Sequence, residues 1–110
     1  MFHNFGFEVS SILENAELER EDLRHPYVGS EHLLLAILKK ESKLTNKLKS
    51  LGLTYENFKE ELIRIIGSAT KLQELILYTP LLRRILELAM VDAEENNKGK
   101  VTEEHLFLAL

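Results

Sequence analysis

Two acidic residues, Glu31 and Glu104, each come directly after a short segment that is typical of a helix start. Each carboxylate should therefore fall in the first turn of a helix, where a negative charge stabilises the helix by about 0.3–1 kcal/mol. A binding role is also chemically reasonable. A carboxylate can hold a guanidinium group through paired, charge-assisted hydrogen bonds, and the neighbouring N–H groups of a helix start can hold a phosphate. These residues alone leave both roles open.

A histidine follows each glutamate, at His32 and His105. A zinc site built on this pair would need two helices to converge and would need further ligands. The Glu-His order also differs from the H-E-x-x-H arrangement of zinc peptidases. We therefore predict no metal site, and we expect both imidazoles to pack near a helix start with a hydrogen bond to the backbone.

Other catalytic and cofactor signatures are absent from the sequence. The chain has no cysteine, which excludes disulfides, thiolate metal sites and cysteine nucleophiles. Gly99-Lys100 lacks the upstream glycine and the following Ser or Thr of a nucleotide-binding loop. We predict a chain that is not an enzyme and binds no cofactor. One enzymatic alternative is a small hydrolase in which Glu31 and Glu104 share a cleft, with their carboxyl groups within about 10 Å.

The composition indicates a folded protein with no basic surface for nucleic acid. Apolar residues make up 45% of the chain and charged residues 29%, which is typical of globular proteins. The formal net charge is −4, whereas a protein that binds nucleic acid through its phosphates needs a basic face. No apolar run approaches the roughly 20 residues that cross a bilayer, and the N-terminus lacks the regions of a signal peptide. We expect a cytoplasmic protein that binds neither nucleic acid nor membrane.

The elements that position these residues are predicted to be helices. Apolar residues recur at helical spacing, period-two alternation is absent, and the fold class should be all-α. The dense apolar run after His32 predicts a buried central helix. We expect Phe5 and Phe7 in the core or over the first helix bundle; the alternative is an exposed aromatic pair that forms part of an adaptor-binding surface. The apolar stripes lie in residues 9–23, 33–38, 44–51, 55–66 and 82–93, with capping residues at Thr54, Thr79-Pro80 and Thr102 that predict helix starts.

An internal repeat is the most informative feature of the sequence. Residues 28–36 (VGSEHLLLA) align with residues 101–109 (VTEEHLFLA), and the same register aligns 12–14 with 85–87. Residues 5–37 have eleven identities in 33 positions with their counterparts, without a gap. Repeats of this kind stack to bury a shared core. We predict two pseudo-symmetric helical bundles, with repeat one at 4–67, a connector at 68–77 and a partial second repeat at 78–110.

The doubled Glu-His-Leu-x-Leu-Ala motif resembles the N-terminal, or Clp repeat, domain of Clp-family AAA+ unfoldases. The Tyr78-Thr79-Pro80 segment is most similar to the ClpC branch. The resemblance covers nearly the whole chain. It implies a domain of two four-helix repeats, of which the second lacks its third and fourth helices here. It also implies a domain that does no chemistry and receives adaptor proteins and substrates for a parent AAA+ hexamer and its peptidase.

In the ClpC branch the resemblance further implies docking of proteins that carry phosphorylated arginine. Glu31 matches the carboxylate of such a site, and the residues before it match the phosphate-binding segment: Val28, Gly29 and Ser30. The second copy is Val101, Thr102, Glu103 and Glu104. Because Glu103 should repel a phosphate, we expect the second site to be the weaker one. The alternative to a docking domain is a free-standing helical repeat protein that acts as a scaffold or regulator.

Overall fold

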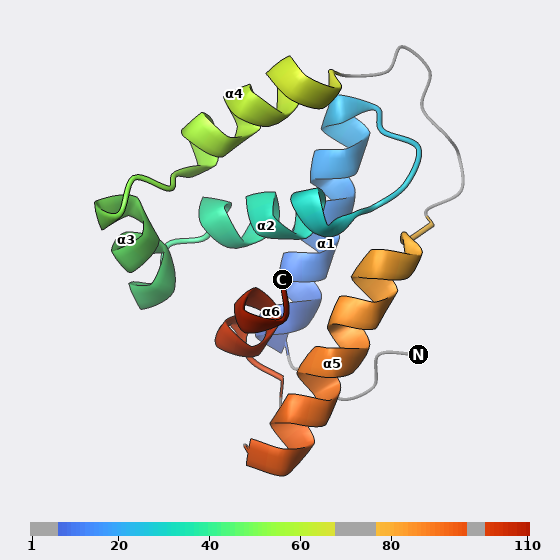
Figure 1. Ribbon diagram of the computed structural model, residues 1–110, viewed down its shortest axis with the longest axis vertical. Coiled ribbons are helices and arrows are strands. Elements are labelled where there is room, and N and C mark those ends of the chain that lie inside the picture. The colour runs from blue at the N-terminus through green and yellow to red at the C-terminus, as the bar shows by residue number, and fades with distance from the viewer. Residues whose placement is uncertain (1–6, 68–76, 97–100) are drawn as a thin grey trace.

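The computed structural model describes residues 7–67, 77–96 and 101–110. In these ranges the chain forms helices and no strand (Figure 1), which confirms the predicted all-α fold class. The helices are α1 (Phe7–Leu23), α2 (Ser30–Lys39), α3 (Lys43–Ser50), α4 (Tyr55–Ile66), α5 (Pro80–Asn96) and α6 (Glu103–Ala109). None of these helices combines the length and the apolar character needed to cross a membrane.

The predicted capping residues lie directly before helices and bond to N–H groups in their first turns. The Thr54 hydroxyl accepts a hydrogen bond from the Asn57 N–H at 3.1 Å, and the Thr79 hydroxyl accepts one from the Leu82 N–H at 3.1 Å. Each bond satisfies an N–H group that has no partner inside its helix. At the other end of α4, Gly67 has a φ of 80°, which glycine adopts without steric cost.

The register of the sequence repeat is preserved in three dimensions. The alignment that pairs Val28 with Val101 also pairs both ends of α1 with both ends of α5, and the first residue of α2 with the first residue of α6. The main core takes matching positions from both units, so the two units bury one shared core, as the repeat predicted. The matched pairs in this core are Val9 and Leu82, Ile12 and Ile85, Leu13 and Leu86, Ala16 and Ala89, Val28 and Val101, and Leu33 and Leu106.

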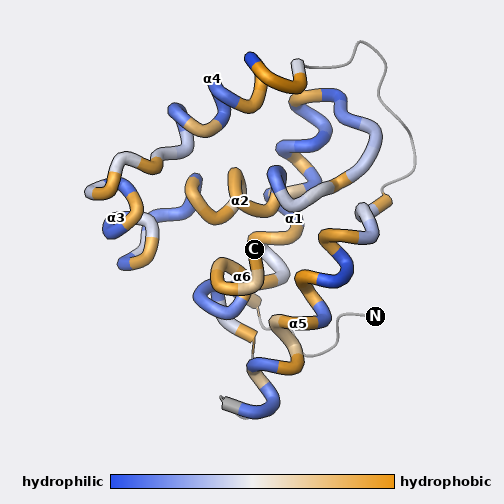
Figure 2. The backbone as a smooth tube through the Cα atoms, in the orientation of Figure 1, coloured by the Kyte–Doolittle hydropathy of each residue, from blue (hydrophilic) through white to orange (hydrophobic). Residues whose placement is uncertain are grey.

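Helix α2 is the buried central helix that its apolar run predicted. Figure 2 shows its largely hydrophobic tube between α1, α4 and α6. Leu33, Ala36 and Ile37 face the shared core. The opposite side of α2 carries Leu35, which packs with Leu23 and Leu62 in a second cluster under α4.

Backbone hydrogen bonds join the segments that precede α2 and α5. The Val28 N–H donates to the Leu77 carbonyl at 2.7 Å, and the Thr79 N–H donates to the Val28 carbonyl at 2.8 Å. This is an isolated parallel bridge between Val28 and Tyr78. It fixes the residues before Glu31 against the second unit.

The expected burial of Phe7 is wrong. Its side chain is 91% exposed, whereas Val9 is fully buried. Two residues of an α-helix lie about 200° apart around its axis, so Phe7 faces away from the side of α1 that Val9 directs into the core. Phe5 lies outside the described residues, and so do residues 68–76 of the predicted connector. The predicted repeat boundaries at 4–67, 68–77 and 78–110 therefore stay predictions.

Candidate ligand-binding site

Helix α2 begins with an imidazole in place of the usual capping side chain. Gly29 is the N-cap residue, and its N–H donates to Nδ1 of His32 at 2.8 Å. In a capping box, the residue at this third helical position is normally Glu or Gln. His32 performs the same function, which confirms the predicted hydrogen bond between this imidazole and the backbone.

A second histidine continues this hydrogen bond into a chain. Nε2 of His32 lies 2.8 Å from Nδ1 of His25, and Nε2 of His25 lies 2.8 Å from the Gly67 carbonyl oxygen. The Gly29 N–H can only donate and the Gly67 oxygen can only accept. Two neutral imidazoles therefore satisfy every bond, with each Nε2 as the donor. The chain ties the start of α2 to the end of α4.

Burial keeps His32 neutral. Its side chain is fully buried, and loss of solvation lowers its pKa to about 4, with smaller contributions from the neighbouring basic groups of His25 and Arg20. No sequence signal pointed to His25, because it lies in a loop apart from the repeated motif and its counterpart in the second unit is Lys98. Only the path of the loop brings the two rings together.

The atoms of His25, Glu31 and His32 that could bind a metal ion lie within 4.8 Å of one another. Both ring nitrogens of each histidine are already used in the hydrogen-bond chain. A metal ion could bind only by breaking one of these buried bonds. The arrangement therefore favours a hydrogen-bonded histidine pair, and the absence of a metal site stays a prediction.

The carboxylate of Glu31 folds back over the start of its own helix. A Cβ atom on Gly29 would lie 2.5 Å from Oε1 and 2.8 Å from Oε2 of Glu31, so this position of the carboxylate requires glycine. Oε1 also lies 3.4 Å from Nδ1 of His32. The carboxylate faces the positive end of α2, and the Glu31 side chain is still 31% exposed. A ligand in solution can therefore reach it.

The other residues of the predicted first site have different roles. Val28 is fully buried, its N–H donates to the Leu77 carbonyl, and its carbonyl accepts from the Thr79 N–H. It positions the site and has no N–H to offer a ligand. The N–H groups of Ser30 and Glu31 donate to no backbone carbonyl in the described part of the chain. These two groups are the ones that could bind an anion at this helix start.

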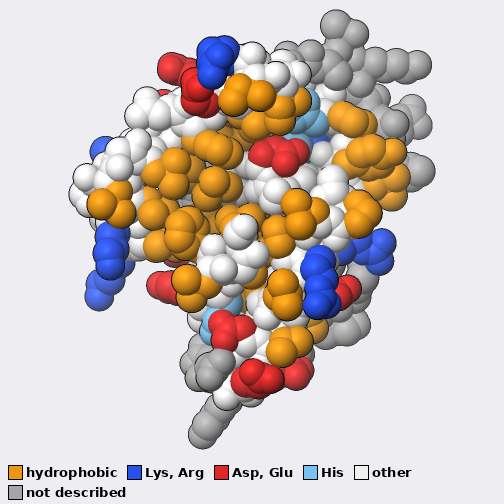
Figure 3. Space-filling model, viewed as in Figure 1, with side chains coloured by type: hydrophobic (Ala, Val, Ile, Leu, Met, Phe, Trp, Pro, Cys, Tyr) orange, Lys and Arg blue, Asp and Glu red, His pale blue; other side chains and the backbone are white. Residues whose placement is uncertain are grey.

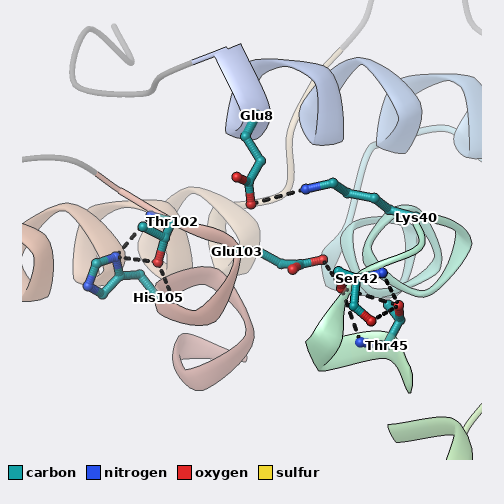
Figure 4. Close-up of polar contacts among 7 residues, drawn as sticks. All are labelled: Glu8, Lys40, Ser42, Thr45, Thr102, Glu103 and His105. Atoms are coloured by element: carbon teal, nitrogen blue, oxygen red, sulfur yellow. Dashed lines mark hydrogen bonds and ion pairs between the residues drawn. The ribbon is translucent and has the colours of Figure 1, made fainter. Parts of the chain in front are cut away.

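The second copy uses the same imidazole cap with a different residue before it. The Thr102 N–H donates to Nδ1 of His105 at 2.9 Å, which confirms the backbone bond predicted for this histidine (Figure 4). The Thr102 hydroxyl accepts from the His105 N–H at 3.4 Å, a bond that Gly29 cannot form. Thr102 therefore caps α6 with its own side chain, whereas α2 has the Glu31 carboxylate at its start.

Glu103 lies elsewhere than the sequence suggested. We expected its carboxylate beside a phosphate position, but the side chain is buried and accepts a hydrogen bond from the Ser42 hydroxyl at 3.2 Å (Figure 4). Ser42 is the N-cap residue of α3, so Glu103 connects the two units. Burial raises its pKa, and the Ser42 hydrogen bond opposes this.

The two candidate carboxylates, Glu31 and Glu104, lie in the first turns of different helices, α2 and α6. Val101 is buried in the shared core like Val28, and Glu104 is exposed. The structure thus has two separate helix starts, each capped in the same way by its own histidine side chain. Only the first of them combines a glycine, a folded-back carboxylate and a histidine pair.

Comparison with known proteins gives one consistent result. The family model described as the Clp repeat (R) N-terminal domain matches residues 4–110. The negative regulator of genetic competence ClpC/MecB of Bacillus subtilis is 32% identical over the whole chain, and the chaperone protein ClpB of Oceanobacillus iheyensis is 31% identical. A ClpA homolog of Cyanidium caldarium is 35% identical. These values do not separate the branches.

The chain spans only 13–14% of the length of these curated relatives. Two solved structures have a similar fold. The N-domain of ClpV from Vibrio cholerae has a TM-score of 0.79 at 23% identity, over 98% of this chain and 66% of that one. A complex of the ClpV N-domain with a VipB peptide has a TM-score of 0.77 at 22% identity, over 98% and 68%.

Proposed function

The chain belongs to the Clp repeat N-terminal domain family, and on that basis we propose that it is a non-catalytic docking domain for adaptor proteins and substrates. The proposal extends to a parent AAA+ unfoldase, its hexamer and its peptidase, because relatives with this domain include ATP-binding subunits of Clp proteases. We propose a cytoplasmic location and no nucleic-acid or membrane partner, in line with the net charge of −4.

Within this function we propose that the start of α2 binds phosphorylated arginine. The observation that carries this proposal is the juxtaposition of the Glu31 carboxylate with the N–H groups of Ser30 and Glu31. A phosphorylated guanidinium presents a donor group and an anion side by side. The carboxylate can accept from the guanidinium, and the helix start can donate to the phosphate.

Binding would require the Glu31 side chain to move. Its carboxylate now lies where a phosphate would approach the helix start, and two negative groups cannot share that position. The side chain is 31% exposed, and its nearest partner, Nδ1 of His32, already accepts from Gly29. The carboxylate can therefore turn outward toward the guanidinium as the phosphate takes its place.

The second helix start fits the same ligand less well. Thr102 carries a side chain where Gly29 has none, and its hydroxyl already caps α6. The repulsion first expected from Glu103 does not contribute to this difference, because its carboxylate is directed toward Ser42. We propose one competent site at Val28–Glu31 and a weakened one at Val101–Glu104.

Calorimetric titration with free phosphoarginine tests this proposal. The intact chain should bind the ligand, Glu31→Ala should lose most of the binding, and Glu104→Ala should change it little. Absence of binding by the intact chain would contradict phosphoarginine recognition and leave docking through the helical surface. Equal losses in the two variants would contradict the asymmetry between the sites.

A further inference from the structure

Nδ1 of His32 faces both a donor and an acceptor at the start of α2. It lies 2.8 Å from the Gly29 nitrogen, from which it accepts a hydrogen bond, and 3.4 Å from Oε1 of Glu31. Figure 3 shows acidic atoms at the surface over this helix start, where a ligand can approach. Because one ring nitrogen either accepts or donates, the position of the His32 proton decides which of the two groups Nδ1 binds.

The position of this proton also decides how firmly the Glu31 carboxylate is held. With the proton on Nε2, Nδ1 accepts from Gly29 and has no hydrogen to offer the carboxylate. With a proton on Nδ1, the ring would donate to Oε1 of Glu31, and a hydrogen bond to a charged group is stronger than one between neutral groups. A phosphate could then reach the helix start only after that bond had broken.

His25 directs the proton of His32 to Nε2. Its own Nδ1 lies 2.8 Å from Nε2 of His32, and its Nε2 lies 2.8 Å from the Gly67 carbonyl oxygen. The carbonyl can only accept, so a neutral His25 keeps its proton on Nε2 and presents a lone pair to His32. His32 is fully buried, so His25 rather than solvent supplies this acceptor.

The acceptor at this position also has to be neutral. A carboxylate in place of His25 would stabilise the imidazolium form of His32, which carries a hydrogen on both nitrogens and would bind Glu31. A second imidazole accepts the bond without adding a negative charge. Burial opposes the charged form as well, and it lowers the pKa of His32 to about 4, so the neutral ring is the form present at neutral pH.

We propose that His25 is a positioning residue for the ligand site at the start of α2, where it acts through His32 to keep the Glu31 carboxylate free to turn outward. The inference rests on the proposed function and deepens it, because it names the residue that makes the carboxylate releasable. The aligned residue of the second unit is Lys98, whose ammonium group cannot accept a hydrogen bond. The sequence thus repeats the capping histidine but not its partner.

Two substitutions of similar size and branching separate this role from a purely structural one. His25→Asn keeps an oxygen near the position of Nδ1, whereas His25→Leu has no acceptor, and both lose the bond to Gly67. In calorimetric titration with free phosphoarginine, His25→Leu should bind at least about tenfold more weakly than the intact chain, because the carboxylate must first leave a charge-assisted hydrogen bond. His25→Asn should recover most of the binding. Equal binding by the two variants, strong or weak, would overturn the inference.

Long-range proton–nitrogen NMR spectra of the imidazole rings test the inference without ligand. His32 should carry its proton on Nε2 alone in the intact chain and in His25→Asn. In His25→Leu, Nδ1 should gain a proton and the chemical shift of the Glu31 carboxylate carbon should change. A proton on Nδ1 in the intact chain would overturn the inference even if neither variant folds. If these spectra are as expected but the intact chain binds no phosphoarginine, the proposed ligand is wrong and the control of Glu31 by His25 stands.

Discussion

At the scale of single residues, the two capping histidines perform one local task in different surroundings. His32 and His105 each accept a hydrogen bond from the backbone N–H of the N-cap residue, Gly29 or Thr102. His32 is fully buried and also donates to His25, whereas the side chain of His105 lies near Asp92 with 11% exposure. The first unit therefore depends on one imidazole staying neutral.

This dependence predicts that the free energy of unfolding varies with pH. Unfolded histidine binds a proton near pH 6.5, but His32 in the folded chain binds one only near pH 4. The unfolded state thus holds more protons between these values, and the free energy of unfolding should fall by about 3 kcal/mol as pH drops from 6.5 to 4. Urea unfolding at several pH values measures this change.

The variant His32→Gln isolates this contribution. Glutamine can accept the Gly29 N–H as in an ordinary capping box but cannot be protonated. Between pH 6.5 and 4 its free energy of unfolding should fall less than that of the intact chain. Above pH 7, where His32 is neutral in both states, the difference between the two chains reports packing alone. If the free energies of unfolding of the two chains changed in parallel over the whole pH range, the result would contradict the neutral histidine pair.

A double-mutant cycle at Gly29 and Glu31 tests the folded-back carboxylate. In Gly29→Ala the new Cβ would meet the Glu31 carboxylate, so the change should cost up to about 1 kcal/mol of lost dipole interaction in addition to the cost of alanine at an N-cap. In a Glu31→Ala background the same change should cost less, because φ at Gly29 is −116°, which alanine can adopt, and only the preference of an N-cap for glycine over alanine remains. Thermal unfolding of the four chains gives the coupling. Additive effects would mean that the carboxylate does not lie against Gly29.

At the scale of the helices, local sequence signals predicted where α4, α5 and α6 begin. Thr54, Thr79 and Thr102 cap the helices that follow them, because a hydroxyl before an apolar stripe satisfies an N–H group of the first turn. The side of a helix that a residue occupies was harder to predict at the ends. Phe7 was expected in the core, but it begins α1 on the side opposite Val9.

Matched leucines at one repeat position should differ sharply in their effect on stability. Leu35→Ala removes a fully buried side chain under α4 and should lower the free energy of unfolding by about 2–5 kcal/mol. Leu108→Ala truncates its exposed counterpart and should change it by at most about 0.5 kcal/mol. Denaturant unfolding of both variants checks the difference. A large loss of unfolding free energy in Leu108→Ala would contradict the exposed position of this side chain.

Glu103 should make the contact between α6 and α3 sensitive to pH. Its pKa is raised in the folded state, so the folded chain binds more protons than the unfolded one above about pH 4.5, and its contribution to stability falls as pH rises. Glu103→Gln keeps an oxygen for the Ser42 hydroxyl and removes the charge. The variant should therefore melt at a higher temperature than the intact chain at pH 7, with a smaller difference at pH 4. A lower melting temperature at pH 7 would contradict a buried, unfavourable charge.

At the scale of the whole molecule, the repeat predicted the architecture because one register sets both the helix starts and the shared core. Contacts between segments that are distant in sequence could not be predicted in this way. The bond from Glu103 to Ser42 and the contact of His25 with His32 depend on how loops and units meet. The position of the Glu31 carboxylate depends on the missing Cβ of Gly29. The sequence pattern showed only that these two residues are close in the chain and did not predict that the carboxylate folds back over Gly29.

As a proposed docking domain, this chain should bind a phosphorylated guanidinium at the start of α2. Amide chemical-shift mapping of the isotope-labelled chain during addition of free phosphoarginine tests it most directly, because it reports where the ligand binds. We expect the largest chemical-shift changes at residues 29–32, with much smaller ones at residues 102–105. Saturable changes centred on the start of α6, or none at any residue, would contradict it.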